Sequence, residues 1–126
     1  MIKGVINIDG YWKVIVYYDI DYDFFNIIIN SLHNIRCSKN TIKKVFINMF
    51  YNKAKAVTIS NLYLYKSIVL FNKHNDYYDY INSIIHEAEH IKQSMLDAYN
   101  IDDVGEPPAY TIGYIASQMI KLFNSD

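Results

Sequence analysis

Cysteine is almost absent from this chain, and its scarcity excludes several kinds of structure that depend on it. Cys37 is the only cysteine among 126 residues, which excludes an intramolecular disulfide and any zinc site built from several cysteines. No nucleophile signature surrounds Cys37, so we interpret it as a small apolar residue. Glycine and proline are also rare, with four and two residues, and no flexible linker rich in them divides the chain. We therefore expect one domain over residues 1–126.

Long apolar runs and an excess of one charge are missing too. Runs such as residues 67–71 are far shorter than the roughly 18 residues that span a bilayer. The N-terminus lacks the apolar stretch and cleavage site of a secretory signal. Twelve basic and thirteen acidic residues give a net charge of −1, which offers no basis for binding nucleic acid. We expect a protein of the cell interior that binds neither a membrane nor nucleic acid.

The residues that are present predict an α+β fold with a small antiparallel or mixed sheet. In chain order we expect a β-hairpin, two helices, a second β-hairpin and two more helices. The first hairpin has strands at 2–8 and 11–18 joined by Asp9-Gly10, and the second has strands at 56–60 and 63–71 joined near Ser60-Asn61. The first two helices are expected at 22–35 and after an N-cap at Asn40 or Thr41. The last two are expected at about 76–99 and from Pro107 to about Phe123. Residues 1–55 thus supply a hairpin and two helices, and residues 56–126 supply the second hairpin and the last two helices.

An H-E-x-x-H motif, His86-Glu87-Ala88-Glu89-His90, lies in the middle of the expected helix 76–99. Histidines four residues apart project from one helix face and can bind one metal ion, with Glu87 beside them as general base for a zinc-bound water. The apolar stripe of this helix is expected on the opposite side: Ile81, Ile84, Ile85, Ala88, Ile91 and Met95. The alternative is two solvated histidines on a polar face.

The other histidines and the middle glutamate of this stretch receive no metal role. His33 and His74 have no partner at ligand spacing and are interpreted as structural or exposed. Glu89 is interpreted as a solvated or salt-bridged side chain. The four histidines of the chain therefore supply two metal ligands.

A third metal ligand has to come from further along the chain. Zinc held by two histidines usually takes a carboxylate or a third histidine as well, and Glu106 is the only glutamate after His90. Glu106 approaches the histidines if the last helix folds back antiparallel to the helix 76–99. The alternative is that a glutamate at a helix N-terminus only interacts favourably with the helix dipole. Asp102 and Asp103 are the alternatives, as ligands or as acceptors for a histidine N–H. Tyr110, one turn after Glu106, is a candidate to stabilise an oxyanion, with packing as its alternative role.

These residues resemble a known family, the zincins whose third ligand is a glutamate (gluzincins). More narrowly, the chain is similar to small H-E-x-x-H proteins of tailed phages, including crAss-like phages, and of mobile elements of gut Bacteroidales. The resemblance covers about residues 56–120 and is carried by a turn at Thr58–Asn61, by Ser67–Phe71, His86-Glu87 and His90, and by Ile101–Asp103, Gly105-Glu106 and Ala109-Tyr110. It implies a minimal zincin-like fold, Zn²⁺ held by His86, His90 and Glu106, and Glu87 as general base.

Two functions are compatible with these features. The first is a zinc-dependent metallopeptidase of a bacteriophage, in which an edge strand at 63–71 binds an extended peptide. The second is a structural virion component of a portal, neck or tail assembly, with a structural or vestigial metal site. The protein would then be found in the virion or in the cytoplasm of the infected bacterial cell, as a homo-oligomer or bound to phage structural proteins. Its interface is expected to use N-terminal tyrosines: Tyr11, Tyr17, Tyr18, Tyr22 and Tyr51.

Overall fold

A computed structural model describes residues 1–100 and 106–124 of the chain, without the side chains of 106–110. Over this part the fold is α+β, as the sequence predicts, with a four-stranded mixed sheet. The elements are β1 (Ile2–Ile8), β2 (Trp12–Tyr18), the 3-10 turn η1 (Tyr22–Phe24), α1 (Phe25–Asn34), α2 (Lys39–Phe46), the π-helical turn η2 (Ile47–Tyr51), β3 (Ala56–Asn61), β4 (Lys66–Phe71), α3 (Tyr77–Tyr99) and α4 (Glu106–Asn124).

Local turn and capping chemistry explains where most of these elements begin and end. The β1–β2 turn places Asp9 and Gly10 at φ 53° and 73°, the left-handed conformations that a tight hairpin requires. The N-cap of α2 is Ser38, whose hydroxyl accepts the backbone N–H of Thr41. The prediction of Asn40 or Thr41 as the cap is therefore wrong, because Ser38 offers an acceptor one position before the helix begins at Lys39.

The strand order, β1-β2-β4-β3, overturns one prediction about the sheet. β4 lies inside the sheet, parallel to β2 and antiparallel to β3, so the segment 63–71 is not an edge strand. The two edges are β1 and β3, and β3 continues through Ser60 and Asn61, where the sequence predicts the turn of the hairpin. The chain turns later than expected, between Asn61 and Lys66. The parallel pairing of β2 with β4 produces this order, and no local signal in the sequence reports it.

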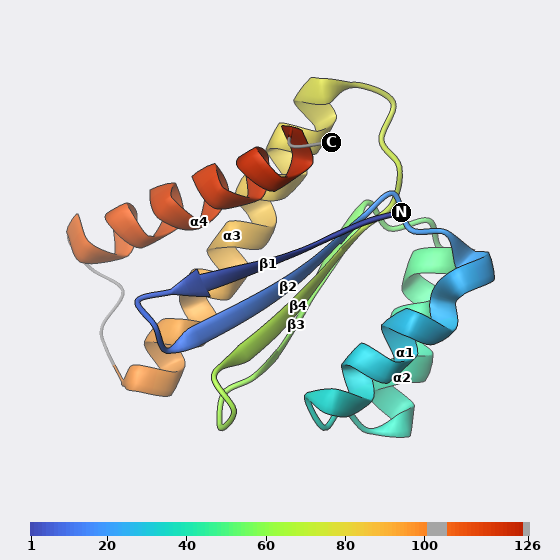
Figure 1. Ribbon diagram of the computed structural model, residues 1–126, viewed down its shortest axis with the longest axis horizontal. Coiled ribbons are helices and arrows are strands. Elements are labelled where there is room, and N and C mark those ends of the chain that lie inside the picture. The colour runs from blue at the N-terminus through green and yellow to red at the C-terminus, as the bar shows by residue number, and fades with distance from the viewer. Residues whose placement is uncertain (101–105, 125–126) are drawn as a thin grey trace.

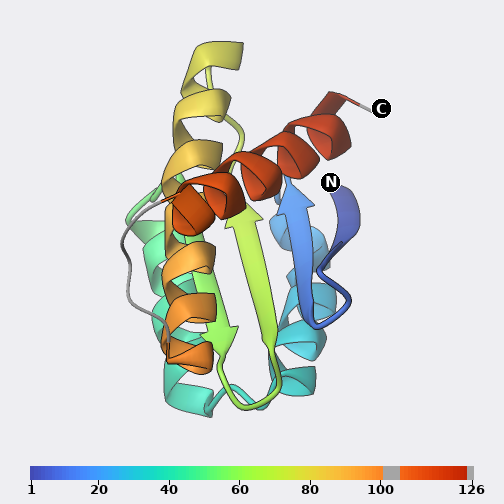
Figure 2. The same ribbon diagram turned by 90° about the vertical axis from the view of Figure 1, so that its left-hand side faces the viewer.

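Helices cover both faces of the sheet (Figure 1). α3 and α4 pack on one face, and α1 and α2 pack on the other, as the rotated view also shows (Figure 2). Each face has its own apolar core. The core under α3 and α4 includes Trp12, Val16, Tyr18, Phe71, Ile84 and Met119. The core under α1 and α2 includes Tyr17, Leu32, Met49, Ile68 and Leu70. No helix in the described part is long and apolar enough to cross a membrane.

Two of the tyrosines expected at an interface are core residues. Tyr17 and Tyr18 are fully buried, one in each core, because successive residues of the interior strand β2 point to opposite covered faces. The hydroxyl of Tyr18 donates to the backbone carbonyl of Met119 in α4 at 2.8 Å. The prediction that these two tyrosines contact a partner is therefore wrong, while Tyr11 and Tyr51 are exposed.

The rotation of α3 about its own axis differs slightly from the predicted one. Asp76 caps its first turn, and Asn100 ends it in the left-handed conformation at φ 56°. Ile84, Ala88, Ile91 and Met95 are buried as expected, but Ile85 is 49% exposed. The helix also packs beside β3, and this contact buries Ser83 and Glu87 on the side away from Ile85. The buried face of α3 therefore includes polar residues on the side that meets β3.

Candidate metal centre

The two histidines of the motif lie on successive turns of α3 and point their rings to a common place. His86 Nε2 and His90 Nε2 are 3.2 Å apart, and the rings meet edge to face. Two nitrogens that each lie about 2.0–2.1 Å from a tetrahedral ion would be separated by about 3.3 Å. The measured spacing therefore fits a shared cation as well as it fits a hydrogen bond between one protonated and one unprotonated nitrogen.

Glu87 supplies a buried carboxylate beside these nitrogens. Only 3% of the residue is exposed, and the Thr58 hydroxyl in β3 donates to Glu87 Oε1 at 3.0 Å. The other oxygen, Oε2, lies 3.9 Å from His86 Nε2. A buried carboxylate needs such donors because it has lost its water shell. The pairing with Thr58 thus fixes which oxygen faces the histidines.

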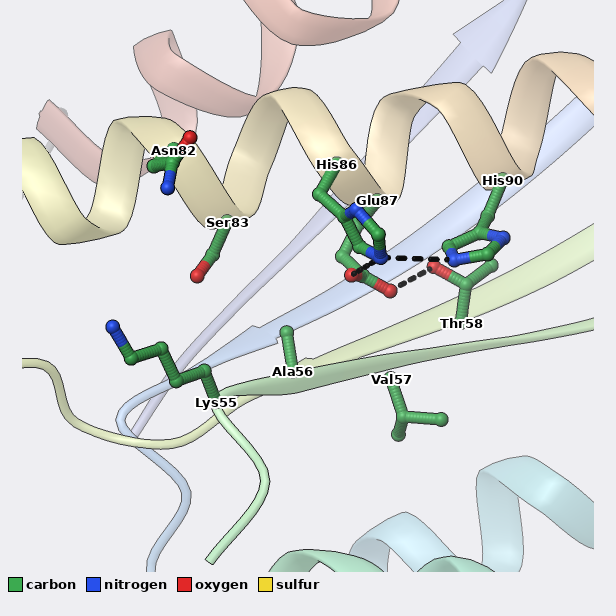
Figure 3. Close-up of a pocket in the computed structure, with 9 residues that line it drawn as sticks. All are labelled: Lys55, Ala56, Val57, Thr58, Asn82, Ser83, His86, Glu87 and His90. Carbon is green, nitrogen blue, oxygen red and sulfur yellow. Dashed lines mark hydrogen bonds and ion pairs between the residues drawn. The ribbon is translucent and has the colours of Figure 1, made fainter.

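The three side chains open into a cleft of about 530 Å³ between α3 and the edge strand β3. Figure 3 shows His86, Glu87 and His90 on the α3 side, with Thr58 facing them from β3. Both histidines are exposed, the side chain of His86 to 70%. The wall of the cleft is completed by Lys55, Ala56, Val57, Asn82 and Ser83. A ligand entering from solvent therefore meets the histidine nitrogens directly.

His86, Glu87 and His90 are the group that could hold a metal ion within the described residues, with their ligand atoms within 4.8 Å of one another. The predicted third ligand, Glu106, is the first residue of α4, but its side chain lies outside the described residues. The same holds for the side chain of Tyr110 and for Asp102 and Asp103, which precede the helix. Their proposed roles stay predictions.

The remaining sequence candidates have ordinary structural roles. Glu89 forms an ion pair with Lys92 at 2.8 Å, so the salt-bridged interpretation is confirmed. His74 is buried and hydrogen-bonded at both ring nitrogens, and His33 is exposed. Cys37 is half-buried against the core under α1 and α2, and burial raises the pKa of its thiol. These positions agree with the structural or exposed roles predicted for them.

Sequence reasoning missed the contributions of β3 and of the first half of α3 to the cleft. Thr58 and Lys55 come from the region of β3, and Ser83 lies one turn before His86. Strand alternation places Thr58 on one face of β3, but only the pairing of the strands shows that this face meets α3. Ser83 carried a weak signal, because it sits three residues before His86 and shares its helix face.

The candidate metal centre thus consists of two histidine nitrogens at ligand spacing and one buried, oriented carboxylate, at the mouth of a cleft beside an edge strand. The resemblance to zincins stays a prediction. No protein-family model, curated protein or solved structure matches the chain.

Proposed function

We propose that this protein is a zinc-dependent hydrolase that cleaves peptides. The observation that carries the proposal is the 3.2 Å approach of His86 Nε2 to His90 Nε2 with the buried Glu87 carboxylate beside them. Two imidazoles one helical turn apart bind the ion in zinc peptidases, and the glutamate next to the first histidine acts as general base. We further propose Glu106 as the third ligand, from its place at the start of α4.

The histidines of the motif would bind the metal ion, and Glu87 would transfer the proton. His86 and His90 would hold the ion. A bound Zn²⁺ lowers the pKa of water and polarises a carbonyl group. Glu87 would accept the proton at Oε2, the oxygen nearer His86, because Thr58 occupies Oε1. Its burial keeps the carboxylate in one orientation.

The edge strand supports a peptide as substrate. β3 pairs with β4 along one side, so the backbone groups along its other side are available to an added strand. That side borders the cleft, since Ala56, Val57 and Thr58 line it together with the motif. An extended peptide that pairs with β3 would run past His86 and His90.

Zinc titration of the wild-type chain tests the metal centre. We expect one equivalent to bind and to raise the melting temperature, since a ligand at 100 times its Kd adds about 2.7 kcal/mol to stability. His86→Ala and His90→Ala should lose this shift, while His33→Ala, an exposed histidine outside the cleft, should keep it. Zinc binding that persists unchanged in both motif variants would refute the site.

A peptide-library digest tests the hydrolysis. Wild-type protein with stoichiometric zinc should cleave, and Glu87→Gln should bind zinc but lose cleavage by about 100-fold or more, because the amide cannot accept the proton. If the zinc-loaded wild type cleaves nothing, the hydrolase proposal fails even where the metal site stands.

The exposed tyrosines favour a second candidate, a structural component of a phage particle. Tyr11, Tyr51, Tyr63 and Tyr78 are all exposed, and aromatic side chains are enriched at protein interfaces. In this role the metal centre would be structural or vestigial. The mass of the protein in solution tests this candidate.

A further inference from the structure

Ser83 and His74 form a hydrogen-bonded pair that the metal centre does not use. Ser83 Oγ lies 2.7 Å from His74 Nε2, and His74 Nδ1 lies 2.7 Å from the backbone carbonyl of Asn72. A carbonyl oxygen can only accept a hydrogen bond, so Nδ1 carries a proton, and in the neutral tautomer Nε2 is the unprotonated nitrogen. In that tautomer Nε2 accepts the hydrogen bond of the Ser83 hydroxyl.

The pair is held in place before any ligand arrives. Both residues are only 8% exposed, and the His74 ring stacks on Tyr80 with the ring centres 4.3 Å apart. Ser83 nevertheless lines the cleft, and its hydroxyl points from α3 into it (Figure 3). A serine bonded to a histidine, which a third group orients in turn, is the arrangement that activates a hydroxyl nucleophile.

We propose that Ser83 is a nucleophile toward carboxylic esters and that His74 is its general base. Ser83 Oγ would form a bond to the ester carbonyl carbon while its proton moves to His74 Nε2. The ester C–O bond then breaks, and the leaving alcohol takes that proton. Water next attacks the acyl-serine, gives its proton to Nε2, and the proton returns to Ser83 Oγ as the carboxylic acid leaves.

The cleft also offers donors for the negative charge that develops on the carbonyl oxygen. The side chains of Lys55 and Asn82 carry N–H groups and line the cleft together with Ser83. The ammonium group of Lys55 is anchored by Asp79 at 3.3 Å, which keeps it near the start of α3. This reaction requires no metal ion, so the proposal for Ser83 can be tested independently of the proposed zinc-dependent activity.

Labelling with a fluorophosphonate tests the proposal on the full-length chain. In this reaction the Ser83 Oγ–P bond forms, the P–F bond breaks and fluoride leaves with the serine proton. We expect one label per chain by intact mass, located on Ser83 by peptide mapping, with or without added zinc. Ser83→Ala should abolish it. Ser94→Ala should keep it, because the Ser94 hydroxyl donates to the backbone carbonyl of His90 and not to a histidine ring nitrogen.

Removal of the base gives the second test. His74→Gln should slow labelling of Ser83 by about 100-fold, the size of a general-base contribution. Because a buried histidine can matter for folding, Ser83→Cys is the parallel variant. Its introduced thiol, beside the imidazole, should react with iodoacetamide at least tenfold faster than the half-buried Cys37 of the same chain.

Two results would overturn the proposal. One is a folded wild-type chain whose Ser83 stays unlabelled while the introduced thiol reacts no faster than Cys37. The other is labelling of Ser83 at the same rate in wild type and in a folded His74→Gln variant. Zinc binding and peptide cleavage are measured separately, so failure of this test leaves the metal centre as it stands.

Discussion

At the scale of single residues, the contact between Thr58 and Glu87 links the cleft to the stability of the fold. The Thr58 hydroxyl is a donor for a carboxylate that is almost fully buried. Thr58→Val keeps the shape of the side chain and removes the donor, so we expect a loss of about 1–3 kcal/mol in the free energy of unfolding. Urea denaturation measures it.

Thr41→Val is the matched control for this change. The Thr41 hydroxyl bonds Ser38 at an exposed helix start, where water can replace the lost partner, so the expected change is within about 0.5 kcal/mol. Equal losses in the two variants would mean that the Thr58 hydroxyl does not stabilise Glu87.

Tyr80 gives the protein a pH dependence in the alkaline range. Burial raises the pKa of Tyr80 to about 12, and the hydrogen bond that its hydroxyl donates to Asp19 adds to this rise. Tyrosines of the unfolded chain titrate near pH 10, so the folded state holds this proton more tightly. The resulting stability is fully present below about pH 10 and is lost as the pH rises toward about 12. Burial raises the pKa of Tyr18 as well, which adds to the same loss.

Tyr80→Phe isolates this contribution. Urea midpoints at about pH 9 and pH 12 should fall less between the two pH values in Tyr80→Phe than in wild type, because the variant has no proton to lose there. Tyr63→Phe, at an exposed position, should follow the wild-type profile. Parallel profiles for wild type and Tyr80→Phe would contradict the raised pKa.

At the scale of elements, the rotation of α3 decides which of two adjacent isoleucines supports the core. Ile84 is fully buried, whereas Ile85 is 49% exposed. Ile84→Ala should cost about 2–5 kcal/mol, because it removes buried methyl groups and leaves a cavity. Ile85→Ala should stay within about 0.5 kcal/mol, because about half of this residue is already exposed to water.

Chemical denaturation of both variants measures this difference, and circular dichroism checks that the helix content is unchanged. If the two substitutions cost the same, α3 must be rotated toward the orientation predicted from its apolar stripe. The candidate metal centre would be affected as well, because the same rotation points Glu87 toward β3.

At the scale of the whole molecule, the surface tyrosines determine how the assembly proposal is tested. Tyr17 and Tyr18 are buried in the two cores, which leaves Tyr11 and Tyr51 as the exposed members of the predicted interface set. A virion component should form a multimer of defined mass in light scattering at tens of micromolar, or require a partner for solubility. Tyr11→Ser combined with Tyr51→Ser should then shift the mass toward the monomer. A wild-type monomer at that concentration would count against the assembly role.

The sequence by itself determined the elements and the placement of the two motif histidines on one helix. Alternating and helical spacing predict the four strands and four helices to within a few residues, because these patterns depend on neighbours in the chain. The H-E-x-x-H spacing predicts that His86 and His90 share one face of a helix, because that follows from helix geometry alone. Errors at this level, such as the cap of α2, concern one or two residues.

Only the tertiary structure decided which strand forms the edge and what surrounds the motif. The pairing of β2 with β4 joins segments about 50 residues apart, and no local pattern encodes it. That pairing makes β3 an edge of the sheet, where Thr58 meets Glu87. The pairing of His74 with Ser83 likewise depends on how the loop after β4 folds against α3. Such contacts are selected by the free energy of the whole packed molecule, so they appear only when all the elements are placed together.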